Sequence, residues 1–189
     1  MKKVLALLLT TLLALTFTAC KGDKNTSSGD TVDLEYFSKL GQIPECEYSL
    51  GESVTKIKDE LSAKLESQDE NSDFYYEVTE GENNTLIDNG AFMYYYQNEK
   101  EENGISFIAS YSEAYGFAVG DIIIEVEKAI ESINYKKTEL TEKNTFFMYG
   151  ASEGTAIICE FEENNIMFVF VDNALCATAI YNNNDWDLD

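Results

Sequence analysis

The segment Tyr48-Ser49-Leu50-Gly51-Glu52-Ser53-Val54 decides the fold, because Phe117-Ala118-Val119-Gly120-Asp121-Ile122-Ile123 resembles it 69 residues later. Both segments place a glycine and an acidic residue before an amphipathic stretch. In each stretch the apolar residues recur in steps of three and four, as on one face of a helix. These residues are Val54, Ile57, Leu61 and Leu65 in the first stretch and Ile123, Val126, Ile130 and Ile133 in the second. The pattern predicts one supersecondary unit, present twice.

Apolar, β-branched and aromatic runs follow each predicted helix and predict antiparallel strands. In the second half the runs are 155–162, 166–171 and 174–181, with turns expected at Asn164-Asn165 and Asp172-Asn173. In the first half they are 91–97, 105–110 and 114–119, and a tripeptide recurs as Phe92-Met93-Tyr94 and Phe147-Met148-Tyr149. The sequence therefore predicts an α+β fold of two tandem helix-plus-antiparallel-sheet repeats that share one core. The repeats are expected at residues 34–116 and 117–183, followed by an acidic tail at residues 184–189.

Such a duplicated unit, opened by Gly51-Glu52 and Gly120-Asp121 and carrying the two Phe-Met-Tyr segments, resembles the tandem-repeat fold of the β-lactamase inhibitory protein. The resemblance spans residues 36–181. It implies that the chain binds proteins through the exposed face of its sheet. It carries over no contact residue, because none of these segments is an inhibitory loop. The alternative in the same class is a single α+β domain without a repeat.

The first twenty residues have the pattern of an export signal. A cationic start, Met1-Lys2-Lys3, precedes an apolar stretch at 4–15 that is shorter than the ~20 residues of a membrane-spanning helix. Phe17-Thr18-Ala19-Cys20 resembles the lipobox of bacterial lipoproteins, in which leucine is more common at the place of Phe17. The resemblance implies that residues 1–19 are removed and that Cys20 carries a lipid. Residues 20–33 would then be a polar tether on the outer face of the bacterial cell membrane. The alternative is an ordinary signal peptide with a chance cysteine.

The composition excludes several classes of function. The chain has 35 acidic and 13 basic residues and a net charge of −22 at pH 7, so its surface repels nucleic acid and favours a cationic partner. It contains no histidine and no arginine, which excludes Ser-His-Asp and Cys-His catalysis and the usual zinc sites. No glycine-rich nucleotide-binding motif occurs. We therefore expect no catalysis, no cofactor and no nucleic-acid binding.

Three further cysteines, Cys46, Cys159 and Cys176, are expected to be buried thiols. With the two turns placed as above, Cys159 would pair with Phe170 and Cys176 with Val169. The two cysteines would then lie two strands apart and on opposite faces of the sheet, beyond the reach of a disulfide.

Tyrosines and acidic residues are the candidates for binding. Tyrosine suits interfaces because it combines a large apolar body with a polar tip, although these tyrosines could instead complete the core. The run 166–171 is apolar on both sides, so the second face of the sheet should be covered by the other half or by a partner. Residues 182–189 lack the glycine and glutamate of an EF-hand loop and are predicted to be a frayed acidic tail. The candidate binding residues are Tyr75, Tyr76, Tyr94, Tyr95, Tyr96, Tyr111 and Tyr115.

The leading functional hypothesis is a membrane-anchored, non-enzymatic module that binds a cationic extracytoplasmic protein on an acidic, tyrosine-rich sheet face. The alternative is a lipoprotein that binds cell-wall glycan or another small ligand through the same tyrosines. A carboxylate-dependent hydrolase is a third hypothesis, which no motif supports.

Overall fold

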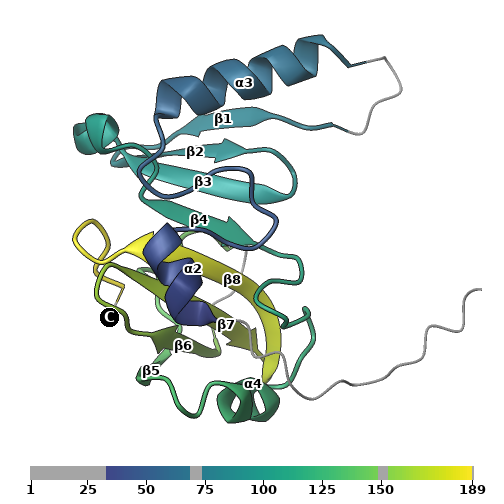
Figure 1. Ribbon diagram of the computed structural model, residues 1–189, viewed down its shortest axis with the longest axis vertical. Coiled ribbons are helices and arrows are strands. Elements are labelled where there is room, and N and C mark those ends of the chain that lie inside the picture. The colour runs from purple at the N-terminus through teal and green to yellow at the C-terminus, as the bar shows by residue number, and fades with distance from the viewer. Residues whose placement is uncertain (1–32, 69–73, 149–152, 189) are drawn as a thin grey trace, which may run out of the picture. The chain divides into compact units, whose positions relative to one another are not determined.

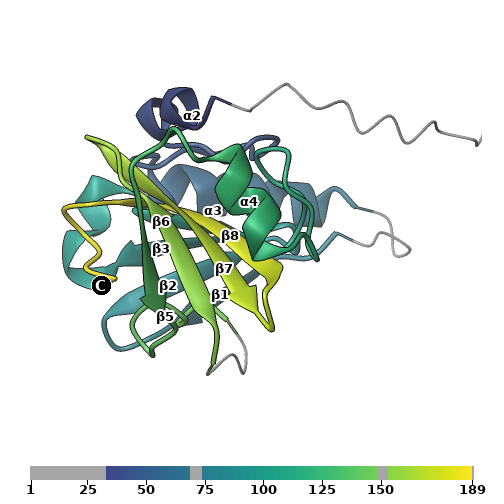
Figure 2. The same cartoon turned by 90° about the horizontal axis from the view of Figure 1, so that it is seen from below.

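The computed structural model describes residues 33–68, 74–148 and 153–188, and these form an antiparallel sheet of eight strands with helices on one face (Figures 1 and 2). The α+β class is confirmed. The elements in chain order are α2 (Leu34–Leu40), α3 (Val54–Glu66), β1 (Glu77–Glu80), β2 (Asn84–Asp88), β3 (Phe92–Gln97), the 3-10 helix η1 (Asn98–Asn103), β4 (Phe107–Ser110), α4 (Ile123–Ala129), β5 (Tyr135–Glu139), β6 (Thr155–Cys159), β7 (Asn164–Val171) and β8 (Ala174–Asn182).

The strands lie in the order β1-β2-β3-β4-β8-β7-β6-β5, and every neighbouring pair is antiparallel. Four strands follow α3 and four follow α4 along the chain. The last strand of each group, β4 or β8, lies at the centre of the sheet and pairs with the other. The edge strands are therefore β1 and β5.

The helices α3 and α4, which follow the two Gly-acid steps, differ in how well their first turns are capped. Ser53 caps α3, because its Oγ accepts a hydrogen bond from the backbone N–H of Lys56. The N-cap of α4 is Ile122, whose side chain cannot accept one, and β-branched residues also lower helix propensity. The helix expected over 123–133 accordingly ends at Ala129, although Ile130 still packs in the core.

Each Gly-acid step is held by two backbone hydrogen bonds to a residue that enters the last strand of its group. The glycine N–H donates to the carbonyl of this strand-entry residue, whose own N–H donates to the carbonyl of the acidic residue. We call each such pair of hydrogen bonds a clamp. In the first clamp these residues are Gly51, Glu52 and Ile105, with N–O distances of 2.7 and 3.0 Å. In the second clamp they are Gly120, Asp121 and Leu175, with both distances at 2.8 Å.

Each clamp is completed by the carboxylate of its acidic residue. Glu52 accepts from the N–H of Ser49, and Asp121 accepts from the N–H of Ala118, three residues earlier in both cases. Both glycines have positive φ, 82° at Gly51 and 99° at Gly120, which a residue with a side chain adopts at a cost. The two Gly-acid steps therefore have the same local structure.

The sheet is covered on both faces, so the core has two layers. The helix-side core contains Val54, Ile57 and Leu61 of α3, Val126 of α4 and Leu34 of α2. The tail-side core lies on the other face, where the β5–β6 connection (residues 140–148) and the C-terminal segment (residues 183–188) pack on the strands.

The expected frayed tail is wrong. Trp186 stacks on Phe146 with ring centroids 4.8 Å apart, and its indole N–H donates to Ser106 Oγ at 2.9 Å. Leu188 is only 3% exposed, and its carbonyl faces the amide of buried Asn144. The tail is acidic but packed on the sheet, because its two apolar residues cover the face opposite the helices. A partner or the other half of the chain was expected from the sequence to cover that face.

Three strands were missed and one was wrongly expected. β1, β2 and β5 are rich in Glu, Asn, Asp and Lys, which gives them little apolar alternation. The run 114–119 is an irregular loop, in which Tyr115 and Gly116 both have positive φ. Composition therefore failed at the two edge strands, β1 and β5, and at β2 beside β1.

The expected turn at Asn164-Asn165 is also wrong, because both residues belong to β7 and the turn is formed by residues 160–163. Cys159 consequently pairs with Ile166, so the expected pairing with Phe170 is wrong, as is that of Cys176 with Val169, which pairs with Ala177. The β7–β8 register steps from Val169–Ala177 to Phe170–Leu175, which leaves Cys176 as the extra residue of a β-bulge.

The cysteines and the recurring tripeptide have different outcomes. Cys159 packs in the helix-side core and Cys176 against the tail-side core, so their placement on opposite faces is confirmed. Cys46, Cys159 and Cys176 are free thiols, and Cys176 is only partly buried. The tripeptides do not occupy corresponding places, because Phe92-Met93-Tyr94 lies in β3 whereas Phe147 and Met148 lie in the β5–β6 connection. Tyr149 lies outside the described residues.

Candidate functional site

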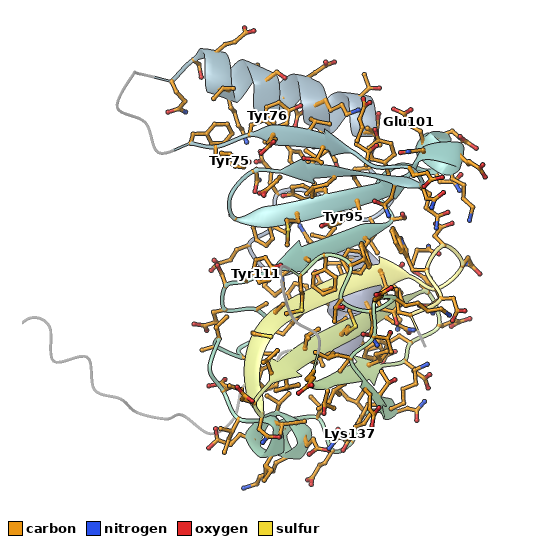
Figure 3. All side chains as sticks on the ribbon, turned by 180° about the vertical axis from the view of Figure 1, so that it is seen from behind. Tyr75, Tyr76, Tyr95, Glu101, Tyr111 and Lys137 are labelled. Carbon is orange, nitrogen blue, oxygen red and sulfur yellow. The ribbon has the colours of Figure 1, made fainter. Side chains whose placement is uncertain are left out.

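The seven candidate tyrosines do not form one surface. Tyr94, Tyr95, Tyr96 and Tyr115 are buried, and Tyr76 is half-buried against the helix-side core. Only Tyr75 and Tyr111 are exposed, at 44% and 41%, and Figure 3 shows them apart, beside β1 and beyond β4. The expected tyrosine-rich sheet face is therefore not present on the described part of the chain.

The buried tyrosines stabilise the core through their hydroxyl groups and rings. The Tyr94 hydroxyl oxygen lies 3.4 Å from Cys46 Sγ, and burial raises the pKa of the Tyr94 phenol. Tyr115 donates to the carbonyl of Gln42 at 3.0 Å, and Tyr96 receives a hydrogen bond from Lys58 at 2.9 Å. Tyr95 lies under the β5–β6 connection, edge-on to a ring of Phe146. Their polar tips are thus used within the chain.

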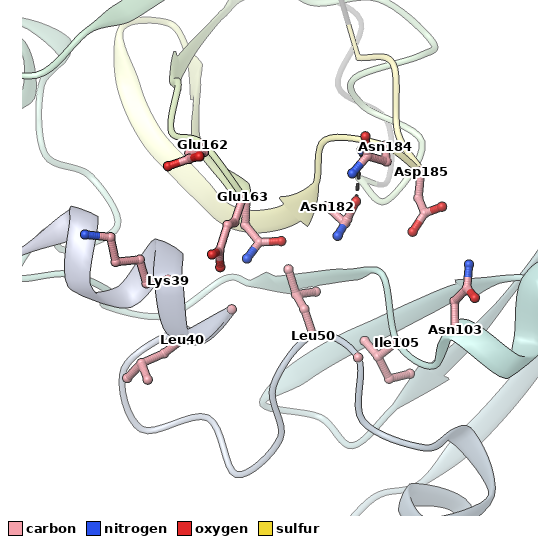
Figure 4. Close-up of a pocket in the computed structure, with 13 residues that line it drawn as sticks. Lys39, Leu40, Leu50, Asn103, Ile105, Glu162, Glu163, Asn182, Asn184 and Asp185 are labelled. Carbon is pink, nitrogen blue, oxygen red and sulfur yellow. Dashed lines mark hydrogen bonds between the residues drawn. The ribbon is translucent and has the colours of Figure 1, made fainter.

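Hollows in the surface surround the acidic turn between β6 and β7, residues 160–163. One of them, which we call the acidic groove, has a volume of about 800 Å³ and is open to solvent. In Figure 4, Glu162 and Glu163 lie on one side and Asn182, Asn184 and Asp185 on the other. Its lining residues are Lys39, Leu40, Gly41, Leu50, Gly51, Asn103, Ile105, Glu162, Glu163, Asn164, Asn182, Asn184 and Asp185.

Asparagines hold the acidic turn in place. Asn164 Nδ2 donates to the carbonyl of Ser38 at 2.8 Å, and Ser38 Oγ donates to the carbonyl of Asn164 at 2.6 Å, which joins α2 to β7. Asn165 Oδ1 accepts from the N–H of Phe161, and Asn183 Nδ2 donates to the Phe161 carbonyl. These bonds fix the backbone on both sides of the turn, so the groove is formed without a ligand.

The carboxylates of Glu162 and Glu163 give the groove its charge. Both are exposed, and no lysine in the described ranges lies within ion-pair distance of either. The lysine beside them, Lys39, is paired with Glu35 at 2.7 Å, and this partner raises the pKa of its ammonium group. Asp185, across the groove, is paired with Lys100 at 2.7 Å. Glu162 and Glu163 therefore have no ion-pair partner in the described ranges, and Lys39, which also lines the groove, acts on Glu163 only at longer range.

This groove was not predicted from the sequence, although two asparagine runs were a signal for it. The asparagine runs at 164–165 and 182–184 were interpreted as a turn and as the start of a frayed tail. The structure brings both runs to the same end of the sheet, because Asn164 of β7 pairs there with Asn182 of β8.

Two further features bear on chemistry and location. Within residues 33–68, 74–148 and 153–188, no three His, Cys, Asp or Glu side chains are arranged to hold a metal ion. No helix in that part of the chain is long and apolar enough to cross a membrane. Cys20, the expected lipid attachment residue, lies outside the described residues.

Comparison with known proteins adds no relative. No family model, no curated protein and no solved structure matches this chain.

Proposed function

We propose that this chain is an exported lipoprotein, anchored through Cys20, that binds a cationic segment of an extracytoplasmic protein in the acidic groove. The single observation that carries the binding proposal is the pair of exposed carboxylates, Glu162 and Glu163, which line the groove and have no ion-pair partner in the described ranges. The export signal and the lipobox-like segment carry the proposal on location. The protein would act by binding alone, which agrees with a sequence without histidine or arginine.

The groove suits a lysine- or arginine-bearing polypeptide in several ways. Glu162 and Glu163 supply charge for an ammonium or guanidinium group, and the Asn103, Asn182 and Asn184 amides offer donors and acceptors for a peptide backbone. Half-exposed Leu40 and Leu50 offer apolar surface for the aliphatic stem of a lysine or arginine side chain. An open groove of this volume accepts an extended segment without rearrangement.

We propose further that the fold is a tandem repeat of the kind found in the β-lactamase inhibitory protein. The two clamps support this, because the Gly-acid steps are 69 residues apart and their strand partners 70 residues apart. The mirrored strand order, with β4 and β8 paired at the centre, supports it too. In this chain the face opposite the helices is occupied by the β5–β6 connection and the tail, so the binding surface is proposed at the end of the sheet instead.

Crosslinked pull-down from the native cell envelope tests the proposed partner. The bait would be the tagged lipoprotein, with E162Q/E163Q as the test variant and E80Q/E82Q as the control, since Glu80 and Glu82 are also exposed but lie at the β1–β2 turn. We expect one basic protein that is captured at low salt, released at high salt and lost with the test variant only. Capture that is equal for both variants would contradict the proposal.

A further inference from the structure

A second groove lies on the other side of the acidic turn and contains the only tryptophan of the chain. It has a volume of about 510 Å³ and is lined by aromatic, amide and charged groups. Trp186 and Leu188 come from the C-terminal segment, Asn165 from β7, Asn183 from the residue after β8, and Lys136 from β5. Its volume falls in the range of small-ligand sites.

The indole of Trp186 is held rigidly in this groove. One face of the ring stacks on Phe146, with an angle of 4° between the rings, and the ring N–H donates to Ser106 Oγ. The side chain is nevertheless only partly buried. A ring whose orientation is fixed in the free protein loses little rotational freedom when a ligand stacks on it.

The polar groups around Trp186 are suited to an uncharged ligand. Lys136 and Glu160 lie 3.1 Å apart and form an ion pair, and Asp187, which also lines the groove, lies 3.4 Å from the ammonium of Lys143. The Asn165 and Asn183 amides already bond Phe161 and Tyr181 but keep capacity for further hydrogen bonds, and the Asn183 Oδ1 is a buried acceptor without a hydrogen-bond partner. An anion would be repelled by the net charge of −22. A wholly apolar ligand would leave the buried Asn183 Oδ1 without a hydrogen-bond partner, which is unfavourable.

We propose that this groove binds a neutral saccharide unit, a function separate from the binding of a cationic segment in the acidic groove. The C–H face of a pyranose carries slight positive charge and stacks on the negative face of an indole. Its hydroxyl groups both donate and accept, which matches the Asn165 and Asn183 amides, the Lys136 ammonium and the Glu160 carboxylate. The ligand class follows from the combination of a fixed aromatic ring with amides and an ion pair.

The single tryptophan makes the test direct, because Trp186 emission reports on this groove alone. The purified protein would be titrated with chitotetraose, cellotetraose and maltotetraose up to millimolar concentration, by fluorescence and by calorimetry. K136Q is the test variant, because Lys136 lines the groove. K137Q is the matched control, because Lys137 is the next residue of β5 and pairs with Glu127 of α4 (Figure 3).

We expect at least one oligosaccharide to shift the emission to a saturating value and to bind K136Q about tenfold more weakly than wild type or K137Q. Thermal unfolding of both variants would verify that the fold is intact. Two results would overturn the proposal: no emission shift and no heat with any of the three oligosaccharides, or binding that K136Q and K137Q affect equally. Neither result would bear on the acidic groove, which both substitutions leave unchanged.

Discussion

Gly104 is a residue at which a single methyl group should disturb the fold strongly. Gly104 has φ 77° and ψ −160° and follows η1. The next residue, Ile105, forms the first clamp just before β4 begins. A Cβ at this position would lie 2.3 Å from the Glu52 carbonyl oxygen and 2.7 Å from that of Gly51. Both oxygens belong to backbone, and the Glu52 oxygen accepts the hydrogen bond from Ile105, so neither moves without opening the clamp.

The expected magnitude for G104A combines two effects. Holding alanine in a backbone region reserved for glycine costs about 1–3 kcal/mol, and the forced contact costs about 1–3 kcal/mol more. We expect a loss of about 3–5 kcal/mol in the free energy of unfolding. G120A is the matched control, because Gly120 has φ 99° in the second clamp but no atom within 4 Å of the added methyl group. It should lose only the backbone contribution of about 1–3 kcal/mol, without the cost of the forced contact.

Urea unfolding measures both values, followed by far-ultraviolet circular dichroism and by Trp186 emission. The two probes must give coincident transitions for the comparison to hold. If G104A and G120A were destabilised equally, to within about 0.5 kcal/mol, the close approach of Gly104 to the first clamp would be refuted.

Three further substitutions test the packing. L188A should lower stability by about 2–4 kcal/mol, whereas D187A should change it by less than about 0.5 kcal/mol; a frayed tail would make both neutral in a urea melt. Y94A should cost about 3–5 kcal/mol and Y75A less than about 1 kcal/mol, because Tyr94 is buried and Tyr75 is not; equal losses would contradict this placement. Burial raises the pKa of the Cys159 thiol to about 12 from an ordinary 9.0, so unfolding at alkaline pH releases a proton that the folded state keeps. Stability should therefore fall from pH ~9 towards pH ~12 by up to about 1.4 kcal/mol per pH unit, and C159A should remove that share of the slope in urea melts across this range; an unchanged slope would contradict the buried thiol.

Local chemistry made some elements predictable from sequence. α3 begins at Val54 as expected, because a serine cap and an apolar repeat of three and four residues coincide there. β7 and β8 were found because their cores, from Ile166 and from Ala174, are almost wholly apolar. The α+β class and the opposite faces of Cys159 and Cys176 followed from these elements alone.

Tertiary contacts decided what the sequence could not reveal. Asn164 reads as a turn residue, yet its side chain binds α2, which lies 126 residues away along the chain. Trp186 and Leu188 stand in an acidic segment, and only the exposed apolar face of the folded sheet gives them a place to pack. Tyrosines were expected at a surface, but their spacing says nothing about whether a hydroxyl group finds a buried partner such as Cys46 or Gln42. The acidic groove was missed for the same reason, since its two sides meet only when β7 pairs with β8.

The measurement that tests the central proposal most directly is the affinity of the purified protein for a short lysine-rich peptide in the acidic groove. It would be measured by calorimetry at low and at high salt for wild type, E162Q/E163Q and E80Q/E82Q. We expect wild type and E80Q/E82Q to bind the peptide with equal affinity and salt to weaken this binding. We also expect E162Q/E163Q to bind about threefold to tenfold more weakly at low salt, since each exposed ion pair contributes modestly. Equal binding by all three proteins, or binding that salt does not affect, would contradict the proposal.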